Sequence, residues 1–471
     1  MKDFMGFSVD NRGDFCYTEE NTEGDVEMLN CNVKNYGAIG DGKILDTQAI
    51  QAAIDDCSAH GGGQVLLEGG EFLSGRIDLK DGVELHIERD AVLLGSTDVN
   101  DFPEIVTDFW RTEYAPRFNK RCFIYAEGCR DIAITGRGAI DCQGRAYVEP
   151  MTQEQMDARP TMSYVRKPFP LPEGSAPLSE EVTMVGAYPH PLDPRSTSLA
   201  PARVALFMGC NNVLVEDVTM RNQPAGWSYW ICDCDNVHFH RAKIFAAVDM
   251  PNNDGIHINC CRNVTVSDCN ISCGDDCVVV RAYSGPLHTP KVCEKVTVTN
   301  CNFTSHTCAV RVGWIDDGVM RNCTFSNLNI TESSTGLCMY LPSNPAKARM
   351  SDQGVEDTLI ENISFSNINI DRNYNFPVRI HISKDNRCKA IRNIYFSNIH
   401  ARSAQMPMIV GREDCHVQNV YFSDCHFSQL PYEQIPTVFA ERMAKLNRPL
   451  HAPKFQCVDN LVFHSTFFNV L

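Results

Sequence analysis

The segment NVTVSDCNI, residues 263–271, decides the fold, because eight versions of its pattern follow one another through the second half of the chain. Each version is a short strand of alternating apolar and polar residues, a polar corner, and two or three further strand residues. The corners recur at intervals of 24 to 40 residues: Asp217, Arg241, Asp268, Asn300, Asn327, Asn367, Asn398 and Asp424. Asn and Asp suit such corners because they tolerate left-handed backbone angles. The alternation predicts strands with one buried face.

Repeats of this length, built from short strands, are typical of solenoids, propellers or long arrays. A propeller blade needs about 40 residues and four strands, and most of these units are too short for that. Coils stacked in register, about 4.8 Å apart, fit the spacing better. The sequence therefore predicts an all-β protein, a parallel β-helix (solenoid). Its irregular intervals would be loops that bulge from one side, where such folds place a binding face.

The N-terminal part of the chain follows a different pattern. Residues 32–75 contain a turn, an amphipathic helix at about residues 46–58, a Gly-rich stop and a strand. Such a helix would cap the first coil and protect the open end of the sheet. Residues 145–200, rich in Pro, Ser and Glu, are interpreted as a long loop excursion between coils. We therefore expect a single β-helix domain over residues 30–471, preceded by an N-terminal extension at 1–29.

Composition restricts the partners of the chain. The formal net charge of −17 repels phosphate backbones, so we expect no nucleic-acid partner. The sequence has no apolar run of 18 residues that would predict a membrane span. The N-terminal segment MKDFMGFSVDNRGDF lacks the apolar core of a signal peptide. The 23 cysteines are odd in number and lack the paired CxxC spacing typical of zinc sites. We therefore expect reduced cysteines packed as small apolar residues, no cysteine-bound zinc, and a cytoplasmic location.

Three acidic residues carry the chemistry that the pattern predicts. Asp275 and Asp276 lie at the mouth of the apolar run SCGDDCVVV, and Asp254 precedes them by 21 and 22 residues, the length of one short coil. In a β-helix this spacing places the acids on neighbouring rungs. Mutual repulsion keeps a proton on one of them beside ionised neighbours, which suits glycosidic cleavage by an acid and a base. On spacing alone, a solvated turn or a Ca²⁺ site remains an equal alternative.

The run NNDGIHINCCRNVTVSDCNISCGDDC, residues 252–277, resembles the signature of glycoside hydrolase family 28, the polygalacturonase family. The opening VKNYGAIGDGKILDTQAIQAAID is also similar to that family, and the resemblance covers roughly residues 30–430. It implies a right-handed parallel β-helix that hydrolyses glycosides with inversion and without metal. It further implies that Asp275 is the general acid and that Asp254 and Asp276 position and deprotonate water. Asn252 would orient the site.

Two other motifs of that family are altered. Its Gly-His-Gly corresponds to SHTCAVRVG, residues 305–313, in one of two registers. One register places Thr307-Cys308-Ala309 at the motif and loses the imidazole, and the other retains His306 as a substrate-binding candidate. A strand slip reverses side-chain directions, which favours the first register. The family's Arg-Ile-Lys, whose basic pair holds a substrate carboxylate, corresponds to Cys338 and Tyr340, and neither is a cation at neutral pH.

Other residues could bind the substrate in place of that pair. Arg281 and Arg311 could hold a uronate from different rungs, or could be outer-face charges that pair with nearby acids. Trp227 could stack on a sugar or pack in the core, and Trp314 is a second candidate for the rim. Since Trp227 and Trp230 are three residues apart, they should point to opposite sides of a strand. The histidines have no metal-ligand spacing and are interpreted as surface or strand residues: His238, His240, His257 and His288.

These observations favour an inverting, exo-acting glycoside hydrolase. The substrate would be a pectin-derived oligosaccharide or a small plant glycoside containing a uronic acid or a related sugar. Long insertions at 145–200 and 340–357 would close the ends of the cleft. Two alternatives remain open. A pectate-lyase-like β-eliminase would need carboxylates clustered for Ca²⁺ and an Arg or Lys base, whereas a non-catalytic carbohydrate-binding solenoid would bind sugar without turnover.

Overall fold

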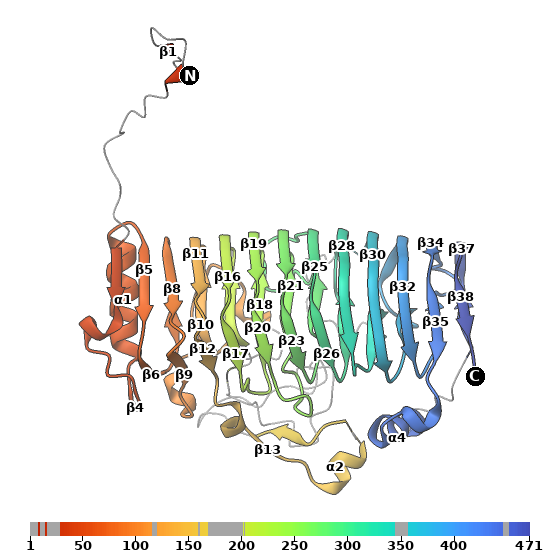
Figure 1. Ribbon diagram of the computed structural model, residues 1–471, viewed down its shortest axis with the longest axis horizontal. Helices are drawn as coiled ribbons and strands as arrows, with labels where there is room; N and C mark the ends of the chain where they lie inside the picture. The colour runs from red at the N-terminus through yellow and green to blue at the C-terminus, as the bar shows by residue number, and fades with distance from the viewer. Residues whose placement is uncertain are drawn as a thin grey trace.

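The fold is a right-handed parallel β-helix, in which successive coils stack from the N-terminal to the C-terminal end of an elongated body (Figure 1). The computed structural model describes residues 8–9, 15–16, 29–114, 120–158, 161–167, 201, 203–343, 357–445 and 452–471. Two long parallel sheets form the walls of this body. The prediction of an all-β parallel solenoid is therefore confirmed.

The shorter sheet has eleven strands, one from each successive coil. In chain order they are β7 (Ile77–Asp78), β10 (Cys122–Glu127), β15 (Arg203–Met208), β18 (Trp227–Cys232), β21 (Ile256–Asn259), β24 (Val278–Arg281), β27 (Cys308–Val312), β29 (Thr335–Leu341), β31 (Val378–Ile382), β33 (Met408–Val410) and β36 (Lys454–Gln456). All of its pairings are parallel. This sheet carries the candidate site.

The longer sheet has 23 strands and bends at the polar corners. Its strands are β3 (Leu29–Asn32), β4 (Asp41–Leu45), β5 (Gly63–Leu67), β6 (Gly70–Ser74), β8 (Val83–Ile87), β9 (Ala91–Gly95), β11 (Arg130–Thr135), β12 (Ala139–Asp141), β16 (Asn211–Glu216), β17 (Thr219–Arg221), β19 (Asp235–His240), β20 (Lys243–Phe245), β22 (Arg262–Ser267), β23 (Asn270–Cys273), β25 (Cys293–Thr299), β26 (Asn302–Ser305), β28 (Val319–Thr331), β30 (Thr358–Asn373), β32 (Cys388–Ser403), β34 (Val417–Ser423), β35 (His426–Gln429), β37 (Val458–His464) and β38 (Phe467–Asn469).

The corners explain how this sheet turns without breaking. All eight predicted corner residues have a positive φ, between 52° and 62°. Four of them stack, because the amide of each Asn donates to the side-chain oxygen of the Asn one coil earlier. The donor–acceptor distances in this ladder are 3.1, 3.2 and 3.0 Å: Asn300, Asn327, Asn367 and Asn398. A short polar side chain that tolerates the left-handed region also links the coils, so the corner pattern and the stacking have one cause.

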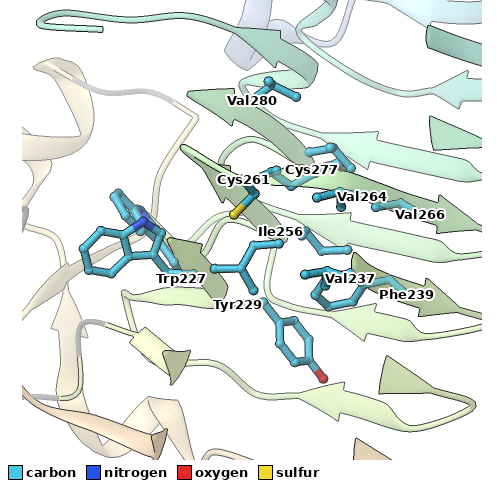
Figure 2. Close-up of a cluster of buried hydrophobic side chains, with 14 of the residues drawn as sticks. Trp227, Tyr229, Val237, Phe239, Ile256, Cys261, Val264, Val266, Cys277 and Val280 are labelled. Atoms are coloured by element: carbon cyan, nitrogen blue, oxygen red, sulfur yellow. The ribbon is translucent and has the colours of Figure 1, made fainter. Parts of the chain in front are cut away.

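The core fills the space between the sheets with one buried side chain at every second strand position. Aromatic rings stack along it at centroid distances of 4.9, 5.2 and 4.7 Å: Phe325, Phe365, Phe396 and Phe422. Figure 2 shows a part of the core, where Val, Ile and Cys side chains from successive coils meet beside Tyr229 and Phe239. Of the 22 cysteines whose side chains the structure describes, 21 are buried, as predicted, and none of the 22 forms a disulfide.

The predicted capping helix is present as α1 (Thr47–Ala59), within one residue of its expected bounds. Its buried side chains recur at helical spacing and pack on the first coil: Ile50, Ala53, Ile54 and Cys57. The carboxylate of Asp46, just before the helix, accepts from the backbone N–H of Ile39 and Gly40 at 2.7 and 3.0 Å. No helix in the described part of the chain combines the length and the apolar character that crossing a membrane requires.

The remaining elements lie outside the stacked coils. They are the antiparallel pairs β1 (Ser8–Val9) with β2 (Phe15–Cys16) and β13 (Val148–Pro150) with β14 (Tyr164–Arg166), the helices α2 (Gln153–Ala158) and α4 (Thr437–Lys445), and the 3-10 helices η1 (Val33–Tyr36), η2 (Val99–Asp101), η3 (Thr112–Tyr114), η5 (Gly144–Tyr147) and η7 (Tyr432–Gln434). In Figure 1, β13, α2 and α4 project from one side of the stack. Most of the predicted extension at 1–29, and much of the excursion at 145–200 and of the insertion at 340–357, lie outside the described residues.

Candidate active site

The three acids meet where two neighbouring strands of the shorter sheet begin. β21 starts at Ile256 and β24 at Val278, and these two residues are paired in register. Asp254 and Asp276 each lie two positions before their strand, so one coil step brings them together, with Asp275 beside them. One carboxylate oxygen from each acid lies within 4.8 Å of the others. The expected stacking of the acids on neighbouring rungs is therefore present.

Buried contacts between the two loops hold this spacing. The amide of Asn253, which is fully buried, donates to the carbonyl of Ala247 at 2.7 Å and accepts from the N–H of Gly274 at 2.7 Å. A Cβ at position 274 would lie 2.2 Å from the carbonyl oxygen of Met250, so only glycine fits there. Asn252, in the left-handed region with a φ of 57°, donates from Nδ2 to Asp275 Oδ2 at 3.0 Å. Asn252 therefore lies where a residue that orients Asp275 is needed.

Asp254 has an aromatic support. The carboxyl is almost fully buried, and its Oδ2 lies 2.7 Å from His257 Nε2. Because an ionised carboxylate only accepts, Nε2 is the donor. The imidazole in turn stacks on the indole of Trp227 with a centroid distance of 3.7 Å and an interplanar angle of 10°. Sequence reasoning treated His257 as an ordinary strand residue. The structure places it on β21 and in direct contact with a candidate catalytic acid.

The rings of Trp227 and Trp230 do not point to opposite sides of the strand, so that prediction is wrong. They pack edge to face at 5.9 Å, and the guanidinium of buried Arg203 lies 4.8 Å from both rings. Trp227 is the first residue of β18, and the pairing with β21 starts only at Tyr229, so strict alternation does not extend to it. Figure 2 shows the Trp227 ring apart from the core side chains that Tyr229 joins. Its contacts with Arg203 and His257 match the packing alternative.

Asp276 is held by Arg311, which reaches it from the next coil. Arg311 donates from Nε to one carboxylate oxygen and from Nη2 to the other at 3.2 Å, and both side chains are buried. Burial lowers the pKa of Arg311, but the charge of Asp276 outweighs this effect and raises it above its usual range. Arg311 is therefore a buried partner of an acid. The predicted pairing with a nearby acid is thus confirmed for Arg311, and because two of its nitrogens already bond to Asp276, the alternative role in binding a substrate uronate has no support from this geometry.

Arg281 also has an internal partner. Its Nε lies 2.6 Å from an oxygen of Asp317, which is fully buried and also accepts from the backbone N–H of Ala282 at 3.1 Å. Burial raises the pKa of Asp317, and the charge of Arg281 opposes that shift. The pairing alternative is thus correct for Arg281. The pair is shielded from solvent, so this geometry gives no support to the alternative role of Arg281 in binding a uronate.

The segment 305–308, which contains the altered Gly-His-Gly motif, contacts the loop of the acids and the C-terminal helix. Thr307 Oγ1 donates to the carbonyl of Gly274 at 3.2 Å, and Cys308 Sγ lies 3.1 Å from Arg311 Nη2. The imidazole of His306 packs edge to face on Phe439 of α4 at 5.2 Å. Thr307 and Cys308 therefore lie beside the loop of the acids, as the first register expects, and the choice between the two registers stays a prediction. His306 lies against the C-terminal helix.

Cys338 and Tyr340, which replace the basic pair, lie beside two arginines. The hydrogen bond with the Cys308 thiol lowers the pKa of Cys338 to about 6, and the charges of Arg311 and Arg379 act in the same direction. The guanidinium of Arg379 lies 3.9 Å from the centroid of the Tyr340 ring. Sequence reasoning missed Arg379. The available signal was its position on the strand after Cys338, which required the pairing of β29 with β31 to be known.

The sequence of the chain is similar to those of known glycoside hydrolases. A protein-family model described as "Glycosyl hydrolases family 28" matches residues 197–435. The chain is 27% identical over 254 residues to a "Probable polygalacturonase" of Vitis vinifera and 26% identical over 263 residues to an "Exo-poly-alpha-D-galacturonosidase" of Dickeya chrysanthemi. These alignments cover 53% and 54% of this chain but only 43% and 42% of the relatives, which is less than half of their length.

A solved structure gives the same result for the fold. The "hyperthermoactive Exopolygalacturonase from Thermotoga maritima" superposes with a TM-score of 0.69 at 21% sequence identity. The superposition covers 94% of this chain and 92% of that chain. At this identity the likeness shows a shared parallel β-helix.

Proposed function

Because the chain belongs to glycosyl hydrolase family 28, we propose that it hydrolyses glycosidic bonds, acting from the chain end of pectin-derived oligosaccharides or on small plant glycosides. The convergence of Asp254, Asp275 and Asp276 within 4.8 Å is the observation that carries this proposal. The printed name of the Dickeya chrysanthemi relative supports exo action on a galacturonan.

The supports of the three acids suggest their roles. Asp275 is the most exposed of the three, and we assign it as the general acid that gives its proton to the glycosidic oxygen as the C–O bond breaks. Asp254 and Asp276, held by His257 and by a buried guanidinium, would orient a water and take its proton as its oxygen attacks the anomeric carbon. The balance is one water consumed, with one new hydroxyl on each product.

The stereochemical outcome is part of the proposal. In most inverting enzymes the two carboxyl groups are about 6.5–9.5 Å apart, whereas retaining enzymes place them about 5 Å apart. Oxygens within 4.8 Å of one another therefore also suit a retaining mechanism. We propose inversion from the resemblance of the acid motif to the family signature. NMR of the first-formed anomer distinguishes the two outcomes.

The central test compares Asp275→Asn with Asp268→Asn. Both variants remove one carboxylate, but Asp268 is an exposed corner with a φ of 58°, where Asn is equally at home. Asp275→Asn should reduce the hydrolysis of oligogalacturonides by at least about 10²-fold, the lower end of what a positioned acid contributes. Asp268→Asn should retain activity. Full turnover by Asp275→Asn would exclude the assignment of the acid, and sugar binding without turnover by the unmodified protein would favour a non-catalytic solenoid.

A chelator separates hydrolysis from elimination. An eliminase of the pectate-lyase type needs Ca²⁺ between carboxylates, but here Arg311 already compensates Asp276. We therefore expect EDTA to leave the activity unchanged. Loss of activity in EDTA, together with a product that absorbs in the ultraviolet because of a new C=C bond, would identify an eliminase.

We also propose a cytoplasmic location. Its support is the cysteine chemistry, since the 22 cysteines whose side chains the structure describes are free thiols and 21 of them are buried. Fractionation of cells that express the natural gene tests this proposal. Recovery of the protein in the periplasm or the culture medium would contradict it.

A further inference from the structure

One column of side chains runs along the face of the shorter sheet that points away from the core. Consecutive strands pair His257 with Val279, Val279 with Arg311, Arg311 with Cys338, and Cys338 with Arg379. Their strand neighbours on the other face belong to the core, as Ile256, Val278, Val310, Leu337 and Val378 do. His257 and Arg311 each hold one of the acids, so this column borders the site. Arg379 lies two rungs beyond Arg311, about 10 Å along the stack.

Arg379 differs from Arg281 and Arg311, the arginines on β24 and β27, in having no carboxylate partner among the described residues. Arg281 is paired with Asp317, and Arg311 is paired with Asp276. Arg379 is half-buried. Its Nη2 lies 3.5 Å from His381 Nδ1, and its Nε is shielded from solvent without a hydrogen-bond partner in the described part of the chain. Such a guanidinium has already lost part of its hydration in the folded protein, and it still has N–H donors that an anion can accept from.

Aromatic rings fix the orientation of this guanidinium. It lies 3.9 Å from the ring centroid of Tyr340 and 5.7 Å from that of Phe376. Tyr340 is itself fixed by His381, stacked at 5.4 Å, and by Trp314, edge to face at 5.7 Å. These rings hold the planar guanidinium in place, and they offer apolar surface on which the C–H face of a sugar can pack.

We propose that Arg379 binds the carboxylate of a uronic acid unit of the substrate and so replaces the basic pair that Cys338 and Tyr340 lack. This inference rests on the proposed glycosidase function and names the class of its substrate as acidic sugars. The Arg fork binds a carboxylate through two parallel hydrogen bonds. The chain has a net charge of −17, which repels an acidic sugar. A guanidinium without a carboxylate partner near the acids attracts that sugar and so offsets the repulsion.

The test measures the selectivity for acid over ester. The substrates are digalacturonic acid and its dimethyl ester, which differ in charge at the proposed contact. Assays at pH 5 keep the Cys338 thiol protonated, since its pKa is about 6, and leave the sugar carboxylates ionised. The unmodified protein should prefer the acid by at least about 10-fold in kcat/KM.

Three variants provide the comparison. Arg379→Gln should lower kcat/KM for the acid by about 10- to 100-fold, mainly through KM, and should leave the ester within about 2-fold. Arg379→Lys keeps a cation without the fork and should recover part of that loss. Arg402→Gln is the matched control, because Arg402 is 53% exposed and pairs with Asp371 on the longer sheet. It should change neither substrate.

Each outcome separates this inference from the proposed function. If the unmodified protein cleaves both compounds equally, or if Arg379→Gln lowers both by the same factor, the carboxylate contact is refuted while the hydrolase remains. If the unmodified protein cleaves neither compound nor any longer oligogalacturonide, both proposals fail. Should Arg379→Gln not fold, as judged by its thermal transition, the acid-to-ester ratios of the unmodified protein and of Arg379→Lys decide the question.

Discussion

Replacement of Arg311 by Met tests whether the buried cation holds Asp276 in place. Arg311 and Asp276 are 7% and 5% exposed, and two hydrogen bonds join them. Met fills a similar volume but brings no charge. The carboxylate of Asp276 then stays in the same surroundings without compensation.

The magnitude follows from the burial of both partners. Removing one partner of a buried ion pair costs about 3–5 kcal/mol, whereas an exposed pair contributes about 0–1 kcal/mol. A chain of 471 residues has an unfolding entropy of about 1 kcal/mol per degree, from about 2.1 cal/mol/K per residue. Arg311→Met should therefore lower the Tm by about 3–5 °C. Displacement of Asp276 should also lower kcat by about 10²-fold, with KM within a few-fold, because Arg311 positions an acid and does not bind the sugar.

A second variant separates the charge from the packing. Asp276→Asn removes the charge that Arg311→Met would leave uncompensated, so the double variant should melt at a higher temperature than Arg311→Met alone. Thermal denaturation followed by circular dichroism measures all four proteins. The reasoning is refuted if Arg311→Met changes the Tm by less than about 1 °C, or if the double variant shows only the sum of the single losses.

Three further predictions concern other contacts of the site. His257→Phe keeps a ring on Trp227 but removes the donor to Asp254, so kcat/KM should fall by about 10- to 100-fold; unchanged kinetics would show that this hydrogen bond is dispensable. Gly274→Ala should cost about 1–3 kcal/mol of stability because its Cβ would overlap the Met250 carbonyl, whereas Gly318→Ala, whose nearest atom lies at 3.6 Å, should be neutral; equal melting temperatures would contradict this. Burial raises the pKa of Asp317, so the folded state binds that proton more tightly than the unfolded state, and stability falls as pH rises from the ordinary value of about 4 through the raised value. Arg281→Met removes the opposing cation, and its loss of stability in denaturant titrations should be larger at pH 8 than at pH 5; an equal loss at both would be inconsistent with a buried, titrating Asp317.

The repeat could be predicted from the sequence because each of its features is local. A corner needs a residue that tolerates a left-handed backbone, and a strand needs one apolar face, so eight corners were located to the residue. The acids followed from the same rule, since one short coil separates Asp254 from Asp275. The helix at 47–59 was recognisable from its own period.

The supports of the acids could not be predicted, because they depend on pairing between coils of unequal length. Arg311 reaches Asp276 across 35 residues, and the pairing of Cys338 with Arg379 spans 41. Neither interval matches the shortest coil, so spacing alone gave no partner for these residues. Trp227 shows a second limit of sequence-based prediction. Alternation assigns side-chain directions only where a strand is paired with both of its neighbours, and β18 begins at Trp227, two residues before its pairing with β21 starts.

The charges on this face suggest how one fold can hold catalytic acids and bind an acidic ligand. Carboxylates within 4.8 Å of one another repel both each other and an incoming anion. Arg311 reduces part of that repulsion, because it is buried and its charge is compensated by the ion pair with Asp276. A second cation is then required for any anionic sugar, and it must lie far enough from the acids to remain unpaired. Arg379, two rungs away and held against Tyr340, meets that condition, so compensation of the acids and recognition of the ligand are assigned to different coils of the same column.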